Sequence, residues 1–77
     1  MVSIEKCPNP QVIVVNTTFD IRQHPGLQII IESIDGVEES LTWGVHKYSF
    51  NVEFGKQFDR EEISRMVISK IEEYLKY

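Results

Sequence analysis

The sequence has very little cysteine, because Cys7 is the only one among 77 residues. A single thiol cannot form an intrachain disulfide, and structural zinc sites take several Cys or His ligands. The two histidines, His24 and His46, lie far from Cys7 and from each other in the chain. The sequence therefore predicts no metal site, no cofactor, and a location in the reducing cytoplasm.

Long hydrophobic runs are also missing. The longest apolar stretches, 12–15 and 29–31, fall far short of the roughly 18 to 20 residues that a membrane-spanning helix needs. No basic and apolar leader follows Met1. We therefore expect no membrane span and no secretion by a leader peptide.

Positive charge is the scarcer sign, with 8 Lys and Arg against 12 Asp and Glu and a net charge of -4. The basic residues are dispersed along the chain, whereas binding to a phosphate backbone needs several cations on one surface. The composition thus argues against a nucleic-acid partner. A hydrophobic content of 42% with few Gly and Pro is typical of a globular protein, and residues 1–77 are expected to form a single compact domain.

Two prolines mark the start of the chain. In Cys7-Pro8-Asn9-Pro10 they fix φ and remove backbone donors, so residues 1–10 are predicted to be an extended or turning lead-in. Residues 11–17 are β-branched and apolar on both faces, which predicts a strand in the interior of a sheet. Residues 18–21 either continue this strand or form a short return strand.

Two segments carry the apolar spacing of helices. The first begins at Pro25, which suits the first helical position, and Gly36 suits the left-handed position that commonly ends a helix. Its apolar residues are Leu27, Ile30, Ile31 and Ile34. Asp59 can cap the second helix. The apolar stripe of that helix is Ile63, Met66, Val67, Ile71, Tyr74 and Leu75.

Between the helices the apolar period changes to two, which predicts a hairpin that turns around Gly44 to His46. One face of its first strand carries Val37, Glu39, Leu41 and Trp43. The buried face of its second strand carries Tyr48, Phe50, Val52 and Phe54. The whole order predicts an α+β fold, in which a small antiparallel or mixed sheet of three to four strands is packed on one face by two α-helices.

Residues typical of catalysis do not form a recognisable pattern. No Ser or Cys lies in a nucleophile elbow, and adjacent glutamates such as Glu61 and Glu62 point to different sides of an element. We therefore predict that the protein is not an enzyme and acts by surface recognition. The candidate partner contacts are Trp43, His46 and Tyr77. The aromatic residues of the hairpin could instead stack on single-stranded nucleic acid, but the acidic balance favours a role in the core.

Several short motifs follow one another in a set order: Cys7-Pro8-Asn9-Pro10 before a strand, His24-Pro25 at the start of a short helix, Ile34-Asp35-Gly36-Val37 at its end, an aromatic hairpin and a final helix. This order resembles the N-terminal domain of Nfu/NifU-like iron-sulfur cluster scaffold proteins, over roughly residues 8–75. The hairpin fits that family's pattern only with a small insertion.

The cluster chemistry of that family resides in a separate Cys-x-x-Cys domain, which this chain lacks. The resemblance therefore implies a protein-contact role, accessory to iron-sulfur cluster assembly, with no cluster ligand on this chain. The alternative is a small regulatory or homodimeric protein-binding module of an unrelated process.

Overall fold

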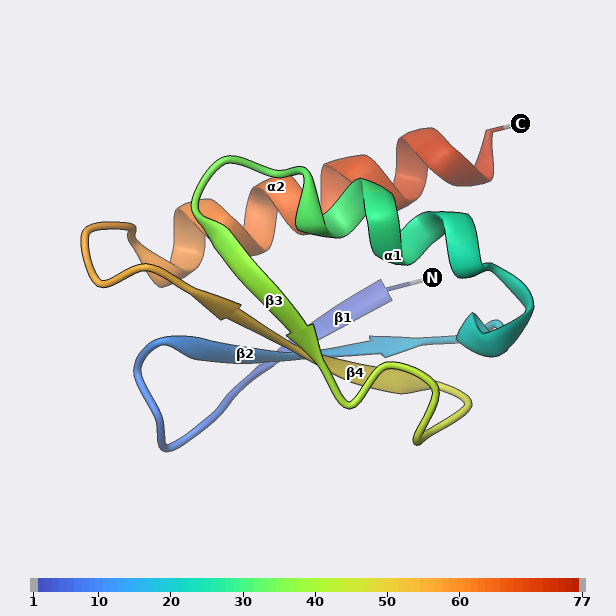
Figure 1. Cartoon of the computed structure of the whole chain (residues 1–77), viewed down its shortest axis with the longest axis horizontal. Helices are drawn as coiled ribbons and strands as arrows, with labels where there is room; N and C mark the ends of the chain where they lie inside the picture. The colour runs from blue at the N-terminus through green and yellow to red at the C-terminus, as the bar shows by residue number, and fades with distance from the viewer. Residues whose placement is uncertain (1, 77) are drawn as a thin grey trace.

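The computed structural model describes residues 2–76, which form one four-stranded sheet and two α-helices (Figure 1). The elements are β1 (Val2–Lys6), β2 (Val12–Thr17), a short 3-10 helix η1 (Ile21–Gln23), α1 (Pro25–Glu32), β3 (Val37–Leu41), β4 (Ser49–Phe54) and α2 (Arg60–Leu75). The strands lie in the order β1-β2-β4-β3, and each neighbouring pair is antiparallel. The predicted α+β fold is confirmed.

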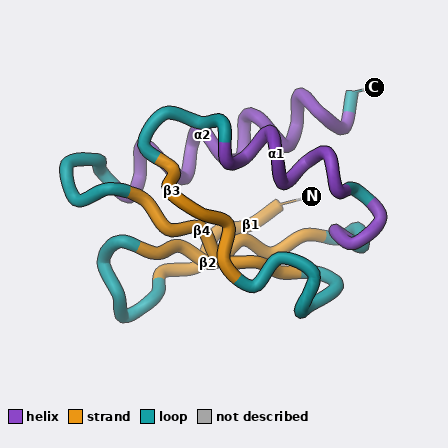
Figure 2. The backbone as a smooth tube through the Cα atoms, in the orientation of Figure 1, coloured by secondary structure: helices purple, strands orange, loops and turns teal. Residues whose placement is uncertain are grey.

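Both helices cover the same face of the sheet, and the core lies between the two layers (Figures 1 and 2). The sheet contributes the buried side chains of Ile13, Val15, Phe50, Val52 and Phe54. The helices contribute Leu27, Ile31, Ile63, Val67 and Ile71. Full burial of one such side chain stabilises the fold by roughly 1.5–3 kcal/mol. Within residues 2–76 no helix covers the other face of the sheet (Figure 1), although Val12 on that face is only 5% exposed.

The first helix begins at Pro25, as the sequence predicts, and ends at Glu32. The chain then turns into β3 through Gly36, which has a φ of 97°. A side chain there would be strained, and a Cβ would also lie 2.9 Å from ring atoms of Phe58. The connection between α1 and β3 therefore depends on glycine for two separate reasons.

The second helix is capped by Asp59, also as predicted. The Asp59 carboxylate accepts a hydrogen bond from the Glu61 N–H at 3.4 Å. Ile63, Val67 and Ile71 of the predicted apolar stripe are buried, but Leu75 at the end of the helix is 44% exposed. The stripe thus covers the sheet along most of α2 and leaves an apolar side chain free at its last residue.

The N-terminal segment adds a strand that the sequence pattern did not reveal. Residues 2–6 of the expected lead-in form β1, which pairs with β2 from Val2 opposite Thr17 to Lys6 opposite Ile13. The proline motif makes the turn between these strands, where the Gln11 N–H donates to Asn9 Oδ1 at 2.9 Å. The prolines therefore separate two strands and do not merely precede the first.

The prediction of a strand in residues 18–21 is wrong. The chain leaves the sheet after Thr17 and enters η1, where Asp20 is the N-cap. The Asp20 carboxylate accepts a hydrogen bond from the Arg22 N–H at 3.0 Å. This local hydrogen bond offers the backbone an alternative to the sheet ladder, which is why the segment turns.

The predicted alternation of residues 37–43 is wrong as well. A β-bulge between Val37 and Glu39 shifts the register, so that Ser40 lies opposite Val52 on the core side of the sheet. Ser40 is only 5% exposed, and the Glu32 carboxylate satisfies it by accepting hydrogen bonds from its N–H at 3.0 Å and its hydroxyl at 2.7 Å. The bulge and this carboxylate together explain how a serine occupies a buried position.

The direction of the backbone groups follows from two hydrogen bonds between β2 and β4. The Thr17 N–H donates to the Tyr48 carbonyl and the Phe54 N–H donates to the Gln11 carbonyl. Alternate residues of an antiparallel strand point to opposite neighbours. The backbone N–H and C=O groups of the odd-numbered residues of β2 therefore point to β4. Those of its even-numbered residues point to β1, where they pair with Ser3 and Glu5. The backbone groups left facing outward on β1 belong to Val2, Ile4 and Lys6.

The same alternation leaves the Val37 and Ser40 amides facing outward on β3, the other edge strand. Both have acceptors within the chain. The Val37 N–H donates to the Ile34 carbonyl at 3.0 Å, and the Ser40 N–H donates to Glu32. The segment from α1 to the start of β3 thus closes one edge of the sheet, whereas the β1 edge stays open.

Candidate functional site

The loop between β3 and β4 displays apolar side chains to solvent. Val45 is 69% exposed and Tyr48 is 53% exposed. Among the described residues, the other large hydrophobic side chains with this degree of exposure are Ile29 on α1 and Leu75 on α2. Two exposed apolar side chains within four residues of one loop form a patch of the kind that often marks a contact with another protein.

The loop has a defined backbone conformation. Thr42 has a φ of 61° and Gly44 a φ of 86°. A left-handed Thr costs of order 1–3 kcal/mol and persists only when surrounding contacts hold it. Here the Thr42 carbonyl accepts a hydrogen bond from the Val45 N–H at 3.0 Å, and its hydroxyl accepts one from the Asn51 N–H at 3.2 Å. The turn is therefore strained, and these two hydrogen bonds hold its conformation.

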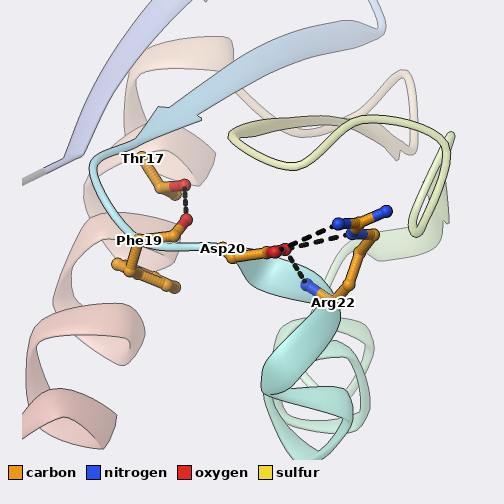
Figure 3. A network of polar contacts seen from close by, with 4 residues as sticks. All are labelled: Thr17, Phe19, Asp20 and Arg22. Carbon is orange, nitrogen blue, oxygen red and sulfur yellow. Dashed lines mark hydrogen bonds and ion pairs between the residues drawn. The ribbon is translucent and has the colours of Figure 1, made fainter.

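The loop is also attached to the segment that follows β2. The Thr17 N–H donates to the Tyr48 carbonyl and the Ile21 N–H donates to the Lys47 carbonyl, each at 2.8 Å. The Thr17 hydroxyl in turn donates to the Phe19 carbonyl at 2.8 Å (Figure 3). These bonds hold the loop and residues 17–22 as one unit at one end of the sheet (Figure 1).

An ion pair lies beside the loop. Arg22 Nε and Nη2 donate to the two Asp20 carboxylate oxygens at 3.2 Å each (Figure 3). The hydrogen bond from Arg22 holds the pKa of Asp20 below its ordinary value, and the same bond raises the pKa of Arg22. Lys47 also lowers the pKa of Asp20 through its charge. The pair fixes a guanidinium near Tyr48, which also raises the pKa of Arg22.

We refer to this area as the loop surface. It consists of Arg22, Trp43, Val45, His46, Lys47 and Tyr48.

Two of the three predicted contact residues lie in the loop surface. Trp43 is half-buried and packs against the core, with its ring centroid 4.7 Å from that of Phe50. Its backbone forms an isolated bridge with His46, whose side chain is exposed. Trp43 therefore anchors the loop to the core, and His46 faces solvent. Tyr77, the third predicted contact, lies outside the described residues.

The prediction that Tyr48 belongs to the core is wrong, and Val45 was not identified as a contact. Strand β4 begins at Ser49, so the alternation that buries Phe50, Val52 and Phe54 does not extend back to Tyr48. An apolar, β-branched residue directly after Gly44 in a turn is a signal that could have identified Val45 from the sequence. Turn positions usually carry polar residues, glycine or proline.

Cys7 and the two histidines occupy three different elements. Cys7 is a half-buried free thiol in the β1–β2 turn, and His46 lies in the β3–β4 loop. His24 precedes α1, where its Nδ1 and the Tyr74 hydroxyl share a hydrogen bond at 3.0 Å and its ring packs edge-on against Phe19 and Tyr74. Within residues 2–76, no three His, Cys, Asp or Glu residues gather as metal ligands would.

A cleft of about 520 Å³ lies at the start of α2. Lys6, Lys56 and Arg60 contribute positive charge to its lining, and Asp59 and Glu61 contribute negative charge. The Asp59 carboxylate is already engaged as the helix cap. The lining of the cleft therefore presents mixed charge.

Comparison of the chain with protein-family models, with curated proteins and with solved structures found no match. Within residues 2–76, no helix has the length and apolar character needed to cross a membrane.

Proposed function

We propose that this protein is a non-catalytic protein-interaction domain that acts in the cytoplasm and binds its partner through the loop surface. The observation that carries the proposal is the exposure of Val45 and Tyr48 on a backbone that internal hydrogen bonds already hold in place. A surface ordered before binding loses little conformational entropy when a partner docks.

The composition of the loop surface supports a protein partner. Tyr, Trp and Arg are the residues most enriched at positions that dominate protein–protein binding energy. Tyr48, Trp43 and Arg22 all belong to the loop surface, and Lys47 adds positive charge to it in an acidic protein. We expect the partner to offer an apolar patch flanked by negative charge.

The motif order that resembles the Nfu N-terminal domain suggests the class of partner. Cys7-Pro8-Asn9-Pro10 forms the β1–β2 turn, and Gly36-Val37 joins α1 to β3. We extend the proposal accordingly to a protein of iron-sulfur cluster assembly. A cluster commonly takes four thiolates and this chain has one, so the proposed role is contact with a partner that carries the cluster.

Affinity capture under reducing conditions tests both parts of the proposal. The bait proteins are the natural chain, the double variant Val45→Ser/Tyr48→Ser, and the matched control Ile29→Ser, which removes an exposed apolar side chain from α1. We expect the natural chain and the control to recover a cluster-assembly protein, and the double variant to recover at least about tenfold less.

Two results would contradict the proposal, and each contradicts a different part. Equal recovery by the double variant would show that the loop surface is not the contact. Recovery of no cluster-assembly protein by the natural chain would remove that class of partner.

A further inference from the structure

The β1 edge of the sheet has unused backbone groups. The N–H and C=O groups of Ile4 and Lys6 point away from β2, and within residues 2–76 no hydrogen bond from another element reaches them. The pairing of β1 with β2 is regular, without a bulge, and β1 contains no proline. Such an edge can accept a further strand.

Apolar side chains follow the same edge on the side covered by α2. Val2 and Ile4 are half-buried, and Leu75 is exposed. Ile68 precedes Leu75 by seven residues, which places both on one flank of the helix. A cleft of about 590 Å³ runs between Val2 and the last turns of α2, and the charged residues of its lining are Glu72, Glu73 and Lys76. A strand added to β1 would cover this flank.

We propose that the added strand is β1 of a second copy of this chain, paired antiparallel about a two-fold axis at Ile4. This register uses the outward backbone groups of both copies and places Ile4 opposite Ile4 of the second copy. Ser3 then lies opposite Glu5 of the second copy, and Val2 opposite Lys6 of the second copy. No two like charges are directly opposed.

Charge complementarity favours a second copy as the occupant. Lys6 lies opposite Ile13 and therefore points to the helix-covered side of the sheet. In the proposed register its side chain enters the cleft beside Val2 of the second copy, where Glu72 and Glu73 outnumber Lys76 and the negative end of the α2 dipole lies. The lysine stem packs along apolar residues while its amine meets carboxylates. The two-fold axis repeats this contact.

Sedimentation across a range of concentrations tests the dimer, with Lys6→Glu as the main variant. We expect the natural chain to dimerise and Lys6→Glu to raise the dissociation constant about tenfold or more, because it places carboxylates together. The matched control is Lys56→Glu, which makes the same change in net charge in the β4–α2 connection. Adding Glu72→Lys to Lys6→Glu should restore most of the affinity.

Hydrogen exchange of the natural chain provides a second measurement that needs no variant. Protection of the Ile4 and Lys6 amides should rise with protein concentration, while the Ser3 and Glu5 amides, which already pair with β2, change little. A third variant, Ile4→Pro, should be monomeric with an unchanged circular dichroism spectrum, because an edge strand tolerates proline where the N–H faces solvent.

A monomer at every concentration up to the millimolar range would overturn the proposal. So would equal effects of Lys6→Glu and Lys56→Glu, or exchange at Ile4 that is independent of concentration. Binding of a strand from an unrelated protein to a strictly monomeric chain would also overturn it. Because the loop surface is not part of this contact, failure here leaves the proposed function standing.

Discussion

The two edge strands of the sheet have the same length, but their outward-facing backbone groups are treated differently: those of β3 have acceptors within the chain, and those of β1 have none among the described residues. The β3 edge carries a bulge, and its outward amides at Val37 and Ser40 donate to groups of α1 and the turn that follows it. The β1 edge is regular, and Ile4 presents its backbone to the surroundings. Bulges are one device by which natural sheets protect their edges, and of the two edge strands β3 has a bulge whereas the pairing of β1 is regular.

The protected edge of this sheet is covered by the part of the chain that directly precedes it in the sequence. Glu32 and Ser40 are eight residues apart, so α1 is next to the strand it protects. The helix nearest β1 is α2, at the opposite end of the sequence. Its flank toward β1 carries Leu75 and one wall of the cleft beside Val2, and no carboxylate of α2 accepts a hydrogen bond from a described residue of β1. The open edge is thus free for intermolecular pairing.

The largest effect is expected from Gly36→Ala, which distorts the turn that brings α1 against the protected edge. The strained φ and the approach to the Phe58 ring should together lower the free energy of unfolding by about 3 kcal/mol. Urea denaturation measures this change. Gly26→Ala is the control, since a Cβ there meets nothing within 4 Å and a helical alanine should stabilise by about 0.5–1 kcal/mol. Equal effects at the two glycines would refute the account of Gly36.

The next effect is expected from Glu32→Ala, which removes the acceptor from the β3 edge. The buried Ser40 N–H and hydroxyl would lose their partner, at a cost of about 1–3 kcal/mol. Urea denaturation measures the cost, and faster exchange of the Ser40 amide should accompany it. Glu38→Ala, at an exposed position in the bulge, should change stability by no more than about 0.5 kcal/mol. If the two variants behave alike, Glu32 does not close this edge.

A pH-dependent effect should distinguish Glu32→Gln from the natural chain. The hydrogen bonds from the Ser40 hydroxyl and N–H hold the pKa of Glu32 below its ordinary value of 4.5. A carboxyl with a lowered pKa in the folded state stabilises the fold above its ordinary pKa, and this contribution is lost as the pH falls through the folded value. The difference in urea midpoint between the two proteins should therefore narrow as the pH falls from neutral to below 4.5. A constant difference would contradict the stabilisation by ionised Glu32.

The smallest effect is expected from Glu5→Ala on the open edge. Glu5 accepts a hydrogen bond from Asn16 Nδ2 at 2.8 Å, but the contact is exposed to water. Its loss should change the free energy of unfolding by less than about 0.5 kcal/mol, measured by urea denaturation at a concentration where the protein is monomeric. A loss as large as that of Glu32→Ala would mean that side chains protect both edges.

Much of the fold follows from local sequence signals. Pro25, Gly36 and Asp59 mark where the helices begin or where the chain turns, and the structure uses each as its chemistry suggests. Strand β1 was missed although Val2 and Ile4 alternate with polar residues, because the prolines that follow suggested a lead-in. The formation of such a short strand depends on pairing with its neighbour, here β2, more than on its own sequence.

The bulge and the loop surface could not be predicted in the same way. The position of Ser40 depends on a carboxylate from α1, and only the folded chain brings the two together. The bulge in turn changes which residues of β3 face the core. The exposure of Tyr48 follows from the start of β4 at Ser49, which the alternation of apolar residues does not mark. Trp43 and His46 were placed in the correct loop, but their roles depend on packing against Phe50 and on the left-handed Thr42.

The central position of β2 in the sheet makes incomplete chains of this protein prone to aggregation. Val12–Thr17 is an uncharged, β-branched segment that lies between β1 and β4. Its partner β4 is synthesised later, because it lies far downstream in the sequence: Val12 pairs with Glu53. A chain interrupted before Ser49 would expose β2 along one side, and uncharged segments of high β-propensity are those that start aggregation. The C-terminal half therefore protects the N-terminal half, and truncated products of this protein should be the forms that a cell must remove.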